Sequence, residues 1–137
     1  MDFLESFSIS RVDLSESSKT FHILNALQEK QYLKHLELSR CLVSDDIGDQ
    51  FRVFLAVNTS LENLELKYNS LNAIACDGIG KGLMKFKGVL KYLGLAGNQI
   101  MEAGFLAIGA GCKSTHHVQK LDVQGCNLGD NGGFRVC

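Results

Sequence analysis

Residues 33–43 read LKHLELSRCLV, and this pattern decides how the whole chain folds. It returns at residues 61–71 (LENLELKYNSL), 90–100 (LKYLGLAGNQI) and 118–128 (VQKLDVQGCNL), so the period is nearly constant. Each aligned column keeps one chemical type, aliphatic at the first, fourth, sixth and last positions and Asn or Cys at the ninth. Such a unit cannot bury its apolar face alone, so we expect neighbouring units to stack.

The N-terminal segment fits the same register when the pattern is extended backwards by one repeat. Five apolar residues then fall on the same columns: Leu4, Phe7, Ile9, Val12 and Leu14. We therefore expect a single domain over residues 1–137, with about five repeats that start near residues 4, 33, 61, 90 and 118. The last repeat stops at Cys137, within its expected helix. Because repeat arrays usually protect their ends with polar caps, we expect either a longer protein or self-association through uncapped ends.

Between the strands, apolar residues recur at helical spacing after polar residues that can cap a helix. We expect the first helix over residues 19–31 and place Phe21 on its apolar face, as we place Ile74 on that of the third helix. Ser44–Asp46 and Asn72 are the expected caps of the second and third helices. Glycines in the fourth helix are expected to allow close helix packing, and these are Gly104, Gly109 and Gly111.

Charge and hydropathy argue against several classes of protein. The chain carries 14 basic and 15 acidic residues, so net charge indicates neither a nucleic-acid partner nor binding to a membrane surface. The first ten residues contain Asp2 and Glu5 and lack the apolar run of a signal peptide. No stretch reaches the roughly eighteen apolar residues of a membrane-spanning helix. We therefore expect a cytoplasmic protein.

The sequence predicts no metal site and no cofactor. The 5 cysteines form no C-x-x-C pair, and their odd number argues against a disulfide framework. Cys112 and His116–His117 have ligand chemistry, but no fourth ligand lies near them in the sequence. Residues 78–82 (GIGKG) lack the spacing of a phosphate-binding loop and fall within an expected helix.

The repeats resemble the leucine-rich repeat, and their length and detail resemble its ribonuclease-inhibitor-like subfamily. Residues 55–66 (LAVNTSLENLEL) and 89–100 (VLKYLGLAGNQI) carry the resemblance most clearly, and it covers nearly the whole chain. The resemblance implies an α/β fold, a right-handed β-α superhelix with parallel strands on the concave face and helices on the convex face. Members bind other proteins, and they include nuclease inhibitors, recognition regions of NOD-like receptors, ciliary proteins and activators of the Ran GTPase.

The exposed strand positions form a contiguous surface where a partner could bind. Glu37 and Glu65 fall in one column as a like-charge pair that favours a basic partner, unless Lys67 and Arg40 neutralise them. Exposed tyrosines are typical of interface hot spots, although a plain solvated surface stays an alternative. The predicted protein-binding residues are His35, Glu37, Asn63, Glu65, Lys67, Tyr68, Tyr92 and Asp122.

We interpret the chain as a non-enzymatic protein-interaction module with no catalytic residues. The partner is a protein of unknown identity that binds the concave face. One alternative is a GTPase-activating protein that resembles the Ran activators, but the sequence offers no distinct catalytic residue because Asn69 and Asn98 belong to the repeat pattern. Another is a structural segment of a longer repeat protein, such as an NOD-like receptor or a ciliary scaffold.

Overall fold

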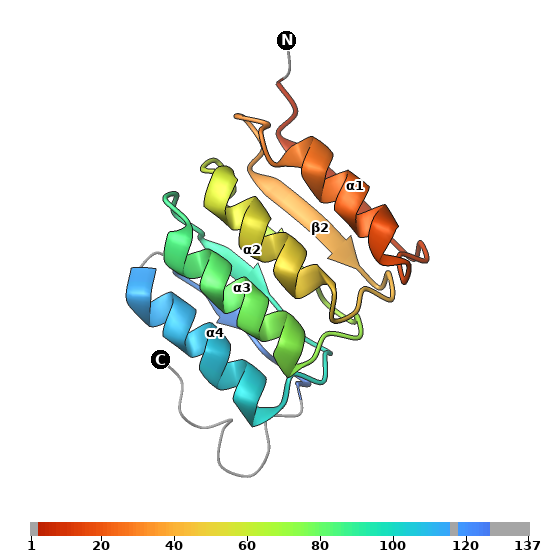
Figure 1. The fold of residues 1–137 in the computed structure, drawn as a ribbon, viewed down its shortest axis with the longest axis vertical. Coiled ribbons are helices and arrows are strands. Elements are labelled where there is room, and N and C mark those ends of the chain that lie inside the picture. Colours follow the sequence, from red (N-terminus) through yellow and green to blue (C-terminus); the bar gives the residue numbers. More distant parts are fainter. Residues whose placement is uncertain (1–2, 116–117, 127–137) are drawn as a thin grey trace.

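Residues 3–115 and 118–126 are described in the computed structural model. In this part of the chain five strands form one sheet: β1 (Ser6–Ser10), β2 (His35–Ser39), β3 (Asn63–Glu65), β4 (Tyr92–Gly94) and β5 (Leu121–Asp122). Four helices alternate with them: α1 (Ser17–Leu27), α2 (Ile47–Val57), α3 (Ala73–Lys85) and α4 (Met101–Thr115). All neighbouring strands are parallel, and the helices lie side by side on one face of the sheet (Figure 1). The predicted solenoid of parallel strands and helices is confirmed.

Strand pairing follows the columns of the sequence repeat. Phe7 pairs with Leu36, Leu36 with Leu64, Leu64 with Leu93, and Leu93 with Leu121. The three central leucines have no exposed surface, because they point from the sheet toward the helices. The predicted register is therefore confirmed, including the alignment of the degenerate first repeat.

The first repeat contributes less to the core than the sequence suggested. Leu14 is buried, but Leu4 and Val12 are exposed, because β1 is the edge strand of the sheet. Phe21 is also exposed, so its predicted place in the core was wrong. The buried side of α1 is formed by Thr20, Leu24 and Leu27 at positions i, i+4 and i+7, and this turns Phe21 outward.

Of two predictions for the third helix, the Asn72 cap is confirmed and the burial of Ile74 is not. Asn72 Oδ1 accepts hydrogen bonds from the backbone N–H groups of Ile74 (3.0 Å) and Ala75 (3.2 Å), as predicted. Ile74 itself is exposed, because it lies in the first turn beside the buried stripe that contains Ile79 and Leu83. Its predicted place on the apolar face was wrong.

The second helix begins without a side-chain cap, so the capping role predicted for Ser44–Asp46 was wrong. Asp46 already has helical dihedral angles, and its side chain makes no capping bond. The carbonyl groups of Ser44 and Asp45 accept hydrogen bonds from the first helical N–H groups instead, both at 3.1 Å. Backbone turns thus replace the side chains at this helix start.

Two asparagines tie the strand ends together. Asn69 Oδ1 accepts from the N–H groups of Cys41 (2.9 Å) and Val43 (3.2 Å) in the preceding repeat. Asn98 Oδ1 accepts in the same way from Asn69 (3.0 Å) and Leu71 (3.1 Å). Each amide nitrogen donates to carbonyl groups of its own and the preceding repeat. These bonds form a ladder of asparagine side chains and backbone groups along the repeats.

Glycines bring the helices into backbone contact. A β-carbon built at Gly78 in α3 would overlap the backbone of Gly48 in α2. One at Gly111 in α4 would lie 2.6 Å from the carbonyl oxygen of Gly80, and one at Gly104 would lie 3.2 Å from Ala73 Cα. Close packing is therefore confirmed for Gly104 and Gly111. Residues 78–82 lie inside α3, so their glycines serve helix packing.

Candidate protein-binding face

The sheet surface away from the helices is here called the strand face, and it carries two rows of outward-facing residues. The first row holds Ser6, His35, Asn63 and Tyr92. The second row, called the acidic row, holds Ser8, Glu37, Glu65, Gly94 and Asp122. Six of the eight predicted binding residues stand in these rows, while Lys67 and Tyr68 follow β3. The structure thus gathers six of the predicted residues on one face, and the binding role of all eight stays a prediction.

The two glutamates of the predicted like-charge pair have different surroundings. Glu37 accepts a hydrogen bond from Ser8 Oγ (2.7 Å), and His35 Nε2 lies 3.9 Å from the same carboxylate oxygen. Glu65 is only 8% exposed, and its Oε2 lies 3.3 Å from Lys67 Nζ. Lys67 therefore balances Glu65, as the alternative interpretation held. Arg40 instead lies over the ring of Tyr68, with its guanidinium carbon 4.2 Å from the ring centre.

The centre of the acidic row is a polar cluster around Gly94. The carboxylate of Glu65 bends over Gly94, where a β-carbon would overlap it. The Tyr92 hydroxyl would lie 2.8 Å from the same β-carbon, and it donates a hydrogen bond to Asp122 Oδ2 (3.3 Å). Burial raises the pKa of Glu65, which Lys67 partly offsets. Burial and the neighbouring carboxylates also raise the pKa of Tyr92, so its hydroxyl remains a hydrogen-bond donor at neutral pH.

Of the two predicted aromatic contacts, Tyr68 is exposed and Tyr92 is half-buried. The ring of Tyr68 lies against the backbone of Gly97, where a β-carbon would overlap it. Tyr68 has a φ of 54°, in the left-handed region. In each repeat the residue before the ninth position of the pattern, where Asn or Cys usually stands, has a positive φ. These residues are Arg11, Arg40, Tyr68, Gly97 and Gly125. Sequence reasoning missed this column, although its two glycines were a signal.

Two further ion pairs lie elsewhere on the surface of the described residues. Lys91 Nζ lies 3.2 Å from Glu62 Oε1, and the two residues hold equivalent positions in neighbouring repeats. Lys81 Nζ lies 2.9 Å from Asp77 Oδ2 along α3, and the two exposed side chains form a solvated ion pair. No cluster of three metal-ligating side chains occurs among residues 3–115 and 118–126. His116–His117 lie outside the described residues.

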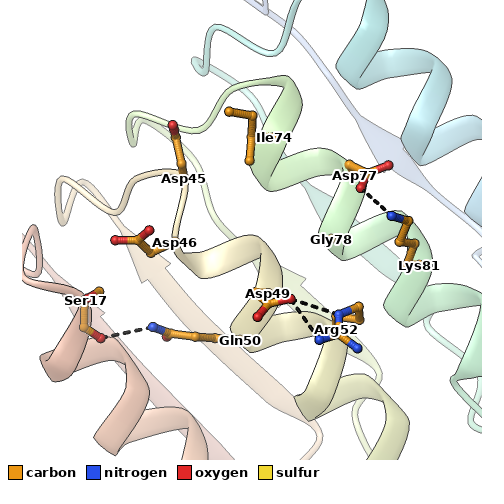
Figure 2. Close-up of a pocket in the computed structure, with 10 residues that line it drawn as sticks. All are labelled: Ser17, Asp45, Asp46, Asp49, Gln50, Arg52, Ile74, Asp77, Gly78 and Lys81. Carbon is orange, nitrogen blue, oxygen red and sulfur yellow. Dashed lines mark hydrogen bonds and ion pairs between the residues drawn. The ribbon is translucent and has the colours of Figure 1, made fainter.

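A hollow on the helix side gathers aspartates that sequence reasoning did not group. Asp45, Asp46, Asp49 and Asp77 line it at the N-terminal ends of α2 and α3 (Figure 2). Asp49 pairs with Arg52 at 2.9 Å, and Gln50 Nε2 donates to the carbonyl oxygen of Ser17 at 3.0 Å. Aspartates near helix N-termini are favoured by the helix dipole, which accounts for their presence without a ligand.

Comparisons with known proteins agree with this geometry. Residues 115–137 match the family model described as leucine-rich repeat. The fold matches a solved structure of leiomodin-1 actin-binding site 2 with a TM-score of 0.74 and 14% identity, over 87% of this chain and 69% of that one. The chain has the leucine-rich-repeat fold. It also matches the tropomodulin C-terminal domain of Caenorhabditis elegans with a TM-score of 0.71 and 11% identity, over 88% of this chain and 74% of that one.

The comparisons leave the finer classification open. Among curated proteins no sequence matches this one. The identities to the solved structures are too low to show more than the leucine-rich-repeat fold, so the ribonuclease-inhibitor-like subfamily stays a prediction. Neither structure's description names a catalytic activity. None of the described helices has the length and hydropathy that a bilayer crossing demands.

Proposed function

We propose that this chain binds a protein partner through the strand face. The observation that carries the proposal is the stack of Arg40, Tyr68 and Gly97, which follow the strands β2, β3 and β4 that carry the acidic row. Tyrosine and arginine are the side chains most enriched at interface hot spots, and here a stacked geometry holds both in place. A rigid array of strands orders these groups before binding, which lowers the entropic cost of association.

Actin is the first partner to test. The leiomodin-1 structure that shares this fold is described as an actin-binding site, although its low identity transfers no individual contact. A cytoplasmic location is consistent with actin, and it is supported by the free thiols of Cys41, Cys76 and Cys126. The GTPase-activating alternative has weaker support, because the side chains of Asn69 and Asn98 are already bonded to backbone groups.

The test compares the two faces of the molecule. The double variant Tyr68→Ala with Tyr92→Ala removes both aromatic contacts of the strand face, while Phe21→Ala with Val53→Ala removes two exposed apolar side chains of the helix side. Binding to purified monomeric actin is measured by calorimetry after circular dichroism has shown that each variant is folded. We expect the first variant to lose at least about tenfold in affinity and the second to match the wild type.

Two results would count against the proposal in different ways. Equal affinity of both double variants would exclude the strand face as the binding surface. Absence of actin binding by the wild type would exclude actin, and the same pair of variants would then be used against any partner recovered with the full protein. Stimulated GTP hydrolysis by a Ran-type GTPase would favour the alternative instead.

A further inference from the structure

The cluster around Gly94 has an unusual arrangement of donors and acceptors. Glu65 lies on β3, Asp122 lies on β5, and Gly94 lies between them on β4. Because Gly94 has no side chain, the Glu65 carboxylate occupies the space above it. The two carboxylates therefore flank a single hydroxyl, that of Tyr92. We call Glu65, Gly94, Asp122 and Tyr92 the Gly94 site.

The Gly94 site has one hydrogen-bond donor fewer than its carboxylates need. Tyr92 donates to Asp122 Oδ2, and Lys67 contacts Glu65 Oε2. Glu65 Oε1 accepts no hydrogen bond from the described residues, although almost none of its surface is exposed. A hydroxyl carries one proton to donate, so Tyr92 cannot satisfy both carboxylates at once. A buried acceptor without a donor destabilises the unbound chain, and a donor supplied from outside would recover that free energy.

We propose that a lysine or arginine side chain of the protein partner binds at the Gly94 site, between Glu65 and Asp122. The strands of these two residues are separated by one strand, about 9.6 Å in all. The Glu65 carboxylate and the Tyr92 hydroxyl occupy the space between them, so an ammonium or guanidinium group would take the place of the hydroxyl beside both carboxylates. Such a group donates charge-assisted hydrogen bonds to both sides, whereas a neutral amide gains less and a carboxylate is repelled. The inference rests on the proposed function, because it assumes that the partner binds the strand face.

Access to the site requires a small side-chain movement. Glu65 Oε1 is covered, so an incoming cation reaches it only when the adjacent Tyr92 hydroxyl moves aside. Tyr92 is half-buried, and its hydrogen bond to Asp122 is long at 3.3 Å. Lys120 Nζ lies 5.7 Å from the Tyr92 ring centre, so the ring already borders one cation. The movement gives up the long hydrogen bond to Asp122 and the interaction of the hydroxyl with Glu65, which the incoming cation replaces.

Short peptides test the site without knowledge of the partner. Three glycine peptides, each with one central arginine, lysine or glutamine, are titrated into the full chain, and the amide signal of Gly94 is followed by NMR. The same titrations are run on Glu65→Gln and Asp122→Asn, which remove one charge each at the site. Glu62→Gln is the matched control, because it removes one charge from the same strand region, at a carboxylate paired with Lys91.

The expected result is a saturable shift of the Gly94 signal with the arginine and lysine peptides and none with the glutamine peptide. Affinity should fall by about tenfold or more in Glu65→Gln and Asp122→Asn and stay unchanged in Glu62→Gln. The inference is overturned if the glutamine peptide binds equally well, if Glu65→Gln and Glu62→Gln weaken binding equally, or if no saturable shift occurs. If the Gly94 signal fails to respond while the strand-face tyrosines are needed for partner binding, the proposed function stands and this inference alone fails.

Discussion

Replacement of Asn98 by alanine should be among the most destabilising single changes in this chain. Its Oδ1 is the hydrogen-bond acceptor for the N–H groups of Asn69 and Leu71, and the Asn98 side chain is buried. The carbonyl groups on its donor side are less dependent on it. Leu66 also accepts from Asn69 Nδ2 (3.0 Å), and Leu95 also accepts from Cys126 Sγ (3.0 Å).

The magnitude follows from the two N–H groups that lose their acceptor. Each buried donor without a partner costs about 1–3 kcal/mol, so Asn98→Ala should lower the free energy of unfolding by about 2–6 kcal/mol. The carbonyl groups add little, since each keeps a second donor. Gln99→Ala is the control, because Gln99 is the exposed neighbour and its loss should change the free energy of unfolding by less than about 0.5 kcal/mol.

Urea unfolding followed by circular dichroism measures both variants, and amide hydrogen exchange locates the loss. The Leu71 amide should exchange much faster in Asn98→Ala than in the control, beyond the change expected from global stability. A difference of less than about 1 kcal/mol between the variants, with equal protection of the Leu71 amide, would refute the account of the ladder. Water that replaces the lost acceptor would produce that result.

Three further predictions concern the helices and the acidic row. Gly78→Ala should lower the free energy of unfolding by about 1–3 kcal/mol in thermal or urea unfolding, despite the better helix propensity of alanine, because its β-carbon overlaps the Gly48 backbone. Asn72→Ala should lower it by about 1 kcal/mol, and Asn72→Asp should restore most of the loss. Glu65→Gln should gain stability relative to the wild type as pH rises. The pKa of Glu65 is raised in the folded state, so folding disfavours the charged carboxylate of the wild type. The stabilities of the two proteins should therefore differ least below the ordinary pKa of 4.5 and most above the raised pKa. Urea unfolding at several pH values checks the sign, and a gap that shrinks with rising pH would contradict it.

The buried half of this structure could be predicted from the sequence because each buried position belongs to a repeated column. Pairing of Phe7 with Leu36 was predictable because both residues fall in one column, even though the first repeat is degenerate. Alternation of side chains along a strand also predicted which residues point outward, so Glu37 and Glu65 could be placed in one row. Helix faces were less predictable: Phe21 is apolar and yet points to solvent, because the buried stripe of α1 starts one residue earlier.

The details of the binding face depend on neighbours in space that no column shows. Glu65 is buried because Gly94, one repeat later in the sequence and beside it in the sheet, leaves room for its carboxylate. Arg40 was expected to balance a glutamate, but the left-handed backbone at this position directs its side chain over Tyr68. The spacing of residues along the sequence indicates neither the burial of Glu65 nor the contact of Arg40 with Tyr68. Both are consequences of how two repeats meet.

Two residues of the strand face are ones that folding alone would not favour. Tyr68 holds a left-handed backbone that costs roughly 1–2 kcal/mol in a residue with a β-carbon, where the last two repeats have Gly97 and Gly125. Glu65 is buried with a carboxylate oxygen that accepts no hydrogen bond from the described residues. Conflicts of this kind collect at functional sites, because there the side chain serves binding at the expense of stability. The ladder asparagines instead favour stability, since both polar atoms of the Asn98 side chain form hydrogen bonds with backbone groups. Stability and binding therefore rest on different residues, and substitutions at the strand face can separate the two.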